Sequence, residues 1–269
     1  MAYKYESTSF VVPAEYKNDL ETFVKQVASW VASNFPELTL DRYSPASSSS
    51  SYAYFNLGDT GIQLRIGVYS SGDYFFCACH GSDVWGSGYG TVISAGSTVS
   101  LQLMVVPKVA MFSTIKTSGN EKFFNSSALA VKEIVSGNSY VLCTLPGVSP
   151  DSSAGKSYFW FPSTYYYKDA SNKTTSVNVS VFPGGISSLA GTISKAENDG
   201  SRSAVISPVF YMKSGPLSLS TAAEDAVKLI YANDGGMPTI TNHVPIQVGS
   251  DQYVALEGSN VGSVYLKVN

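Results

Sequence analysis

Short runs of alternating apolar and polar residues, separated by Gly, Asn, Ser and Pro, recur through most of this chain and constrain its fold. In residues 61–69, for example, every second residue from Ile62 to Val68 is aliphatic. A period of two places such residues on one face of a β-strand. Many short strands with turn residues between them are typical of an antiparallel sandwich or a barrel-like sheet. We therefore predict a mainly β protein.

The turn residues predict two hairpins. Residues 70–73, Ser-Ser-Gly-Asp, connect the run at 61–69 with another at 74–80. A second hairpin is expected between 91–94 and 99–106, around Gly96. A strand or a free arm is expected at 3–12, and further strands are expected at 52–57, 110–116, 128–135, 139–145, 157–161, 176–182, 204–212, 245–248, 253–256 and 263–268.

One segment, at about residues 14–35, has a helical period instead. Its apolar residues recur at spacings of three and four between Pro13 and Pro36, which predicts an N-terminal amphipathic α-helix. We expect its apolar stripe to dock on a sheet of the same chain; packing against a neighbouring subunit is the alternative. The capping-box spacing of Thr221 and Glu224 favours a short helical turn, with a strand at 228–232 as the alternative.

The stretch 146–156, rich in Pro, Gly and Ser, is the best place for a domain boundary. Residues 1–145 would then form a domain with the helix and a β structure. Residues 146–269 would form a second β region, either as a separate domain or as part of the same one. The serine-rich residues 47–51 are expected to form a loop.

Ionisable side chains are scarce in this sequence. Charged residues make up 14% of it, against 13% aromatic residues, and it has two histidines. Acid–base and nucleophilic catalysis depend on tuned titratable groups, so we predict no enzymatic activity, no catalytic residues and no cofactor. A net charge of −3 offers no basic stripe for nucleic acid, and no apolar run is long enough for a membrane span.

One grouping of side chains is suited to metal binding: Cys77, Cys79, His80 and Asp83, with Cys143 as a distant third thiol. A structural zinc site usually takes four ligands from two such pairs, and a second Cys/His pair is missing from the sequence. We therefore predict no metal site. The cysteines are expected to be buried thiols, consistent with synthesis in a reducing compartment.

Two aromatic segments are candidates for contact with other molecules. The glycine-rich residues 81–90 and the aromatic residues 158–167 could instead fold back on the core or pack across a sheet. Aromatic side chains in loops are common at protein interfaces. Aromatic rings also stack on sugars, so a carbohydrate-binding β module of an adhesin or receptor-binding protein is the alternative function. The possible contact residues are Trp85, Tyr89, Trp160, Tyr165, Tyr166 and Tyr167.

The carboxyl-terminal residues 244–256, Val-Pro-Ile-Gln-Val-Gly-Ser-Asp-Gln-Tyr-Val-Ala-Leu, are followed by an apolar run, Gly-Ser-Val-Tyr-Leu-Lys-Val, at 262–268. This ending resembles those of tailed-bacteriophage virion proteins of the neck, tail and baseplate, in which such strands close a β domain. The resemblance covers only these two runs. It implies a β-rich subunit repeated around a symmetry axis, without catalytic residues.

From the composition and this resemblance we expect a structural subunit of a bacteriophage particle. It would be synthesised in the host cytoplasm and located in the virion. Its partners would be copies of itself and other virion proteins, through non-covalent contacts made by residues 3–12 and 81–90. Nucleic acid and membrane are not expected partners, and a host-surface glycan is the partner in the alternative function.

Overall fold

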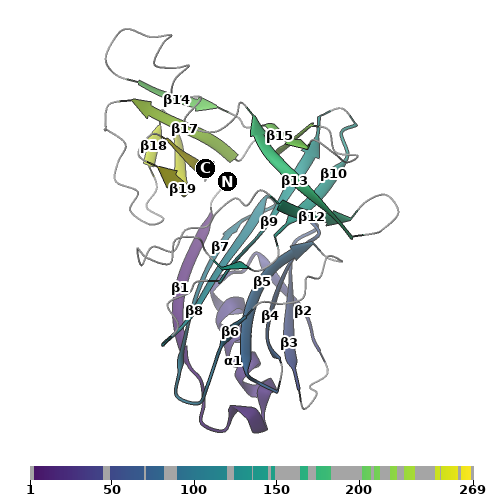
Figure 1. Ribbon diagram of the computed structural model, residues 1–269, viewed down its shortest axis with the longest axis vertical. Coiled ribbons are helices and arrows are strands. Elements are labelled where there is room, and N and C mark those ends of the chain that lie inside the picture. Colours follow the sequence, from purple (N-terminus) through teal and green to yellow (C-terminus); the bar gives the residue numbers. More distant parts are fainter. Residues whose placement is uncertain are drawn as a thin grey trace.

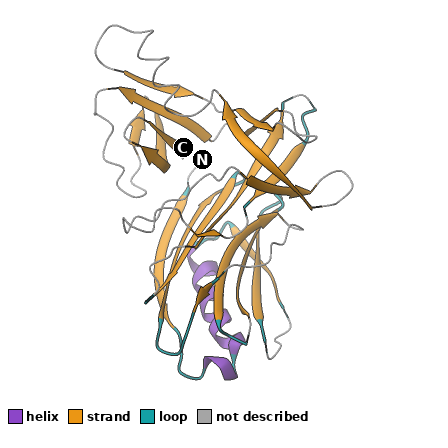
Figure 2. Cartoon of the chain, in the orientation of Figure 1, coloured by secondary structure: helices purple, strands orange, loops and turns teal. Residues whose placement is uncertain are grey.

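The computed structural model describes residues 3–44, 49–69, 71–81, 90–119, 124–134, 136–144, 147–148, 164–168, 174–182, 202–206, 209–212, 219–222, 227–233, 246–248, 250–259 and 262–267. The chain is mainly β, with two antiparallel sheets packed together and one N-terminal helix (Figures 1 and 2). The two packed sheets do not close on each other. The predicted fold class is therefore confirmed.

The larger sheet begins with a long strand at its edge. Its first five strands, in the order β1-β7-β8-β9-β10, are Lys4–Val11, Thr98–Val106, Ala110–Thr117, Phe124–Glu133 and Ser139–Cys143. It continues through β12, β13, β15 and β16, which are Thr164–Lys168, Thr174–Phe182, Val209–Met212 and Leu219–Ala222. The short β11, Gly147–Val148, pairs with β9, and β16 also pairs with the far end of β9.

The second packed sheet has the order β2-β3-β4-β5-β6. Its strands are Leu38–Tyr43, Ser51–Leu57, Ile62–Tyr69, Tyr74–Gly81 and Thr91–Val92. The predicted hairpin between β4 and β5 is confirmed, because the register runs from Ile62 opposite Gly81 to Tyr69 opposite Tyr74. Its turn places Gly72 at a φ of 85°, a conformation that glycine adopts readily.

The predicted hairpin between residues 91–94 and 99–106 is wrong. β6 pairs with β5 in one sheet, whereas β7 pairs with β1 and β8 in the other. The backbone of the intervening turn bonds to Val12: the Val12 N–H donates to Ser97 O, and the Gly96 N–H donates to Val12 O. These bonds direct β7 toward β1, so the turn connects the two sheets.

The predicted helix is confirmed with a later start. The α-helix α1 is Leu20–Asn34, and the 3₁₀ turn η1 precedes it at Tyr16–Asn18. Asp19 fixes the start, because its carboxylate accepts a hydrogen bond from the Thr22 N–H at 3.0 Å. None of the helices in the described ranges combines the length and the hydropathy that a membrane span requires.

The helix packs between the two sheets, which confirms that its apolar stripe docks within the same chain. The Phe23 ring lies 5.9 Å from the ring of Phe75 on β5, and the Trp30 ring lies 6.1 Å from that of Phe10 on β1. β5 and β1 belong to different sheets, so the helix joins both in one hydrophobic core. Figures 1 and 2 show the helix enclosed at the lower end of the molecule.

Five further strands form a separate sheet near the carboxyl terminus. In the order β14-β17-β20-β19-β18 they are Arg202–Ile206, Val227–Asn233, Gly262–Lys267, Asp251–Ser259 and Ile246–Val248. The predicted single strand at 204–212 is therefore two strands, β14 and β15, in different sheets. The predicted helical turn at 221–229 is wrong, because β16 and β17 occupy its described residues and neighbouring strands satisfy their backbone groups.

Three further points concern the strands and the division of the chain. The predicted strand at 157–161 lies outside the described residues. The short strands β2 and β16 were not predicted. The division into residues 1–145 and 146–269 stays a prediction, although strands from both parts pair in the larger sheet, as Cys143 does with Tyr166.

Candidate functional site

The predicted contact residues lie partly outside the described ranges. This holds for Trp85, Tyr89 and Trp160. The remaining three, Tyr165, Tyr166 and Tyr167, lie on β12. Tyr167 is buried, and its ring meets the Tyr140 ring edge-on at 6.2 Å. Tyr166 is partly buried against the main hydrophobic core, so these two tyrosines contribute to packing within the chain.

The three thiols lie in the interior. Cys77 and Cys79 on β5 and Cys143 on β10 are all buried and reduced. The Ser113 hydroxyl donates to Cys77 O at 2.9 Å, and the Cys79 N–H donates to Ser126 Oγ at 2.9 Å, so hydroxyls of the larger sheet hold β5 through its backbone.

Burial also sets the protonation state of these thiols. It raises the pKa of Cys77 to about 12 and that of Cys143 to about 11, because desolvation disfavours the thiolate. At neutral pH these thiols are protonated and therefore poor nucleophiles and poor metal ligands. Within the described part of the chain, no group of three or more His, Cys, Asp or Glu side chains is arranged to hold a metal ion. Asp83 is not among the described residues.

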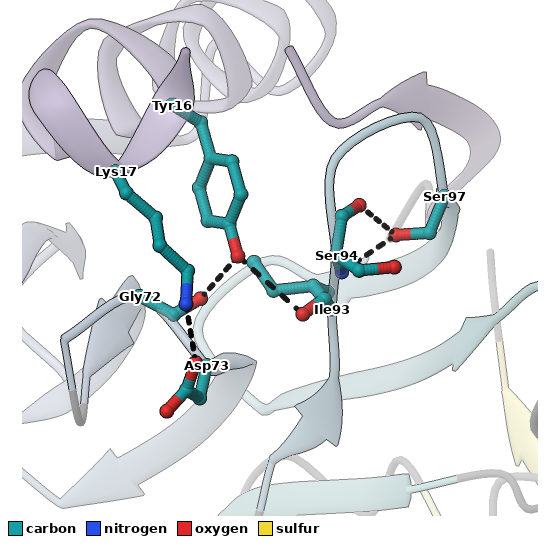
Figure 3. Close-up of polar contacts among 7 residues, drawn as sticks. All are labelled: Tyr16, Lys17, Gly72, Asp73, Ile93, Ser94 and Ser97. Atoms are coloured by element: carbon teal, nitrogen blue, oxygen red, sulfur yellow. Dashed lines mark hydrogen bonds and ion pairs between the residues drawn. The ribbon is translucent and has the colours of Figure 1, made fainter. Parts of the chain in front are cut away.

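A depression of about 290 Å³ lies where η1 meets the turns before β5 and after β6. There the Tyr16 hydroxyl donates to Gly72 O at 2.9 Å, and Lys17 Nζ lies 2.7 Å from Asp73 Oδ1 (Figure 3). Ser97 closes the second turn by donating to Ser94 O at 2.7 Å. The Tyr16 and Lys17 contacts fasten the helix entry to the turn before β5, and the Tyr16 hydroxyl also lies 3.4 Å from Ile93 O next to the second turn. We therefore assign these contacts a structural role.

The strongest candidate site is the outer face of the β2–β6 sheet. Side chains alternate along β3, so Ala53, Phe55 and Leu57 enter the core while Tyr52 and Tyr54 point to the opposite face. The register aligns side chains from β2, β4 and β5 with them. We call this surface the aromatic–arginine face and define it by Arg42, Tyr52, Tyr54, Arg65, Tyr69, Tyr74 and Phe76.

Guanidinium groups and rings stack across this face. The Arg65 guanidinium lies 4.0 Å from the Tyr52 ring centroid and 4.9 Å from that of Phe76. The Arg42 guanidinium lies 4.2 Å from the Tyr54 ring centroid. Each such contact contributes roughly 0.5–2 kcal/mol, depending on its exposure to water. Arg42 on β2 and Arg65 on β4 therefore contact rings on two strands, β3 and β5.

Ring-to-ring contacts extend the row to the β4–β5 turn. The Tyr52 and Phe76 centroids are 5.5 Å apart, and those of Phe76 and Tyr69 are 5.8 Å apart. Tyr69 and Tyr74 stack nearly parallel, with centroids at 5.2 Å and planes at 18°. Aromatic pairs across strands stabilise a sheet and limit the rotamers of their members. The face is therefore ordered before any partner binds.

A glycine allows this arrangement. A Cβ on Gly67 would lie 2.3 Å from Tyr52 Cδ1 and 2.5 Å from Ser51 O. Glycine within a strand otherwise weakens it, and a cross-strand aromatic ring over the glycine compensates. The Tyr52 ring thus covers Gly67, and the Arg65 guanidinium stacks on the same ring.

The exposure of these side chains limits what the face can do. Phe76 is buried, whereas Tyr52, Tyr54, Tyr69 and Tyr74 are partly exposed. Beside them, the Gln63 side-chain amide donates to Asn56 Oδ1 at 2.7 Å. Rings, guanidinium groups, hydroxyls and amides bind by stacking and hydrogen bonding. They do not supply a nucleophile and a general base, so the face is suited to recognition.

The sequence carries a signal for this face in its predicted strands. The alternation that points Ile62 and Val68 inward also points Arg65 outward, and Tyr52 and Tyr54 have the same spacing on the preceding strand. Combining the outward residues of successive predicted strands would have identified it.

Comparisons of the chain with protein family models, with curated proteins and with solved structures found no match.

Proposed function

We propose that this chain is a structural subunit of a tailed-bacteriophage particle, in its neck, tail or baseplate, and that it acts through non-covalent contacts between subunits. The aromatic–arginine face supports the contact function, and the resemblance of residues 244–256 and 262–268 supports the place in a phage particle. Tyr, Phe and Arg are enriched in the buried centres of protein interfaces, where most of the binding energy resides. The low charged fraction of the chain, 14%, favours burial against neighbours in the same way.

The order of the face strengthens this proposal. Association is weakened by the entropy that is lost when flexible side chains are immobilised. On this face the Arg65 guanidinium is already stacked on Tyr52, and Tyr69 is already stacked on Tyr74. A partner that covers these side chains therefore restricts little additional motion.

We assign the contact to this face and no longer to an N-terminal arm. Most of residues 3–12 belong to β1, which pairs with β7 along its whole length from Lys4 to Val11. Phe10 and Val12 are buried in the core. Deleting this segment would therefore damage the fold as well as any assembly.

The second candidate is carbohydrate binding at the same face. Tyrosine rings beside the amides of Asn56 and Gln63 favour it, since sugars stack on rings and hydrogen-bond to amides. The guanidinium groups argue against it, because they lie over the rings of Tyr52 and Tyr54 at 4.0 and 4.2 Å. A sugar would have to displace them.

A glycan array distinguishes the two candidates. We expect no glycan to bind the wild-type chain. Binding that is lost in Tyr74→Ala, Trp85→Ala or Trp160→Ala would favour the carbohydrate module.

Particle fractionation tests the main proposal. Virus particles from a lysate of cells that carry the gene are purified on a density gradient, and peptides of this chain are quantified by mass spectrometry. We expect the chain to co-purify with the particles in a fixed ratio to the other virion proteins, while a soluble host protein stays at the top of the gradient. Recovery of the chain only in the soluble fraction would contradict the proposal.

A further inference from the structure

The charge of the aromatic–arginine face is opposite to that of the chain as a whole. Its defining residues include two arginines and no carboxylate, and Asp41, at a bulge in β2, pairs with Arg42. The whole chain has 20 Asp and Glu against 17 Lys and Arg. The excess of carboxylates therefore lies elsewhere on the chain.

The stacked arginines are well suited to bind carboxylates. The Arg42 side chain is 53% exposed although its Nη1 pairs with Asp41, and the Tyr54 ring supports its plane. A guanidinium is weakly hydrated and presents its N–H donors in a fixed fork that matches a carboxylate. A ring that holds the group in place reduces the entropy lost when the ion pair forms.

We infer that the aromatic–arginine face binds a carboxylate-bearing surface of a second copy of this chain, in a head-to-tail contact. Two such faces placed against each other would oppose guanidinium to guanidinium, so a two-fold contact through this face is disfavoured. A contact between two different surfaces repeats from copy to copy and produces a ring or a helical array. The inference rests on the proposed function and names the partner for its contact surface.

Sedimentation equilibrium of the full chain tests the inference at about 0.1 M and about 1 M NaCl, where the Debye length is roughly 10 and 3 Å. We expect the dissociation constant for self-association to rise about tenfold or more between these conditions, because the salt screens the ion pairs. Arg42→Gln at low salt should produce a rise of about tenfold, as expected for the loss of a buried interface arginine.

Two further variants separate the effect of the face from those of net charge and of folding. Lys108→Gln removes one positive charge from the exposed β7–β8 turn and should leave the dissociation constant unchanged. Arg65→Lys keeps the charge but loses the planar group, and it should weaken association less than Arg65→Gln does. The thermal unfolding midpoint of each variant verifies that it is folded. Because the Arg42 side chain is half exposed, Arg42→Gln is the variant expected to disturb folding least.

Each negative result has a distinct meaning. Association that is insensitive to salt and to Arg42→Gln would overturn the role of the guanidinium groups, while the proposed function would still stand. Equal weakening by Lys108→Gln would also overturn that role. A wild-type chain that stays monomeric would overturn the second copy as the partner, and particle fractionation would still decide the proposed function independently.

Discussion

The two faces of the β2–β6 sheet use the same strands for different purposes. The inner face presents aliphatic and aromatic side chains such as Phe55, Leu64 and Ile66, which are completely buried against the helix and the larger sheet. The outer face presents tyrosines and arginines that remain partly exposed while stacking on one another. One sheet thus completes the core on one side and presents an ordered row of rings and guanidinium groups on the other.

The energetic contributions of the two faces should differ accordingly. Burying a large apolar side chain completely contributes about 1.5–3 kcal/mol, whereas a partly exposed stacking contact contributes roughly 0.5–1.5 kcal/mol. Substitutions on the inner face should therefore affect folding, and those on the outer face should mainly affect association.

The largest effect on the free energy of unfolding is expected on the inner face of β3, and a truncation on the outer face of the same strand is its control. Phe55→Ala should lower the free energy of unfolding by about 3–5 kcal/mol, because it removes a fully buried ring and leaves a cavity. Tyr54→Ala, one residue away on the outer face, should lower it by about 1 kcal/mol. Urea denaturation monitored by circular dichroism measures both values, and equal losses would show that the faces do not differ as described.

The next effect concerns the glycine under the aromatic–arginine face. Gly67→Ala should lower the free energy of unfolding by about 1–3 kcal/mol, because the new methyl group meets the Tyr52 ring and the Ser51 carbonyl oxygen. Adding Tyr52→Ala to this variant should recover part of the loss, since the ring clash disappears. A Gly67→Ala variant as stable as the wild type would show that the Tyr52 ring does not cover Gly67.

The ionisation of the buried thiols should have the smallest effect on stability, and none at neutral pH. The folded state raises the pKa of Cys77 from an ordinary 9.0 to about 12 and that of Cys143 to about 11. Above pH 9 the unfolded thiols lose protons while the folded ones keep them, so the free energy of unfolding should fall as the pH rises from 9 toward 12. Below pH 9 these groups should cause no change.

Alkylation by iodoacetamide at about pH 8.5 tests directly whether the thiols are buried and protonated in the folded chain. The three cysteines should react about 100-fold or more slowly in the folded chain than in urea, because burial restricts both access and thiolate formation. Fast reaction of Cys77 in the folded chain would mean that the inner face is open.

The sequence predicted those parts of the fold that depend on local periodicity. The apolar stripe of the helix depends on consecutive residues, and the β4–β5 hairpin depends on two adjacent strands and a short turn. The failures concern strand partners: nothing local to residues 91–106 shows that β7 turns toward β1, and nothing local to 204–212 shows two strands in separate sheets. Pairing between segments distant in sequence decides such cases.

The candidate site was missed for a related reason. The aromatic residues of 81–90 and 158–167 are clustered in sequence, whereas the aromatic–arginine face is assembled from single residues on separate strands. Arg65 reaches Tyr52 only because the β3–β4 register places Gly67 opposite that tyrosine. Outward-facing residues become a site once the register is known.

Tyrosine footprinting tests most directly the central claim that the outer face is the contact surface. Hydroxyl-radical labelling of Tyr52, Tyr54 and Tyr74 is measured by mass spectrometry in dilute chain and in assembled chain, with Tyr3 as a reference outside the face. We predict that assembly protects the three tyrosines and leaves the reference unchanged. Equal labelling of the three tyrosines in both samples would contradict the account.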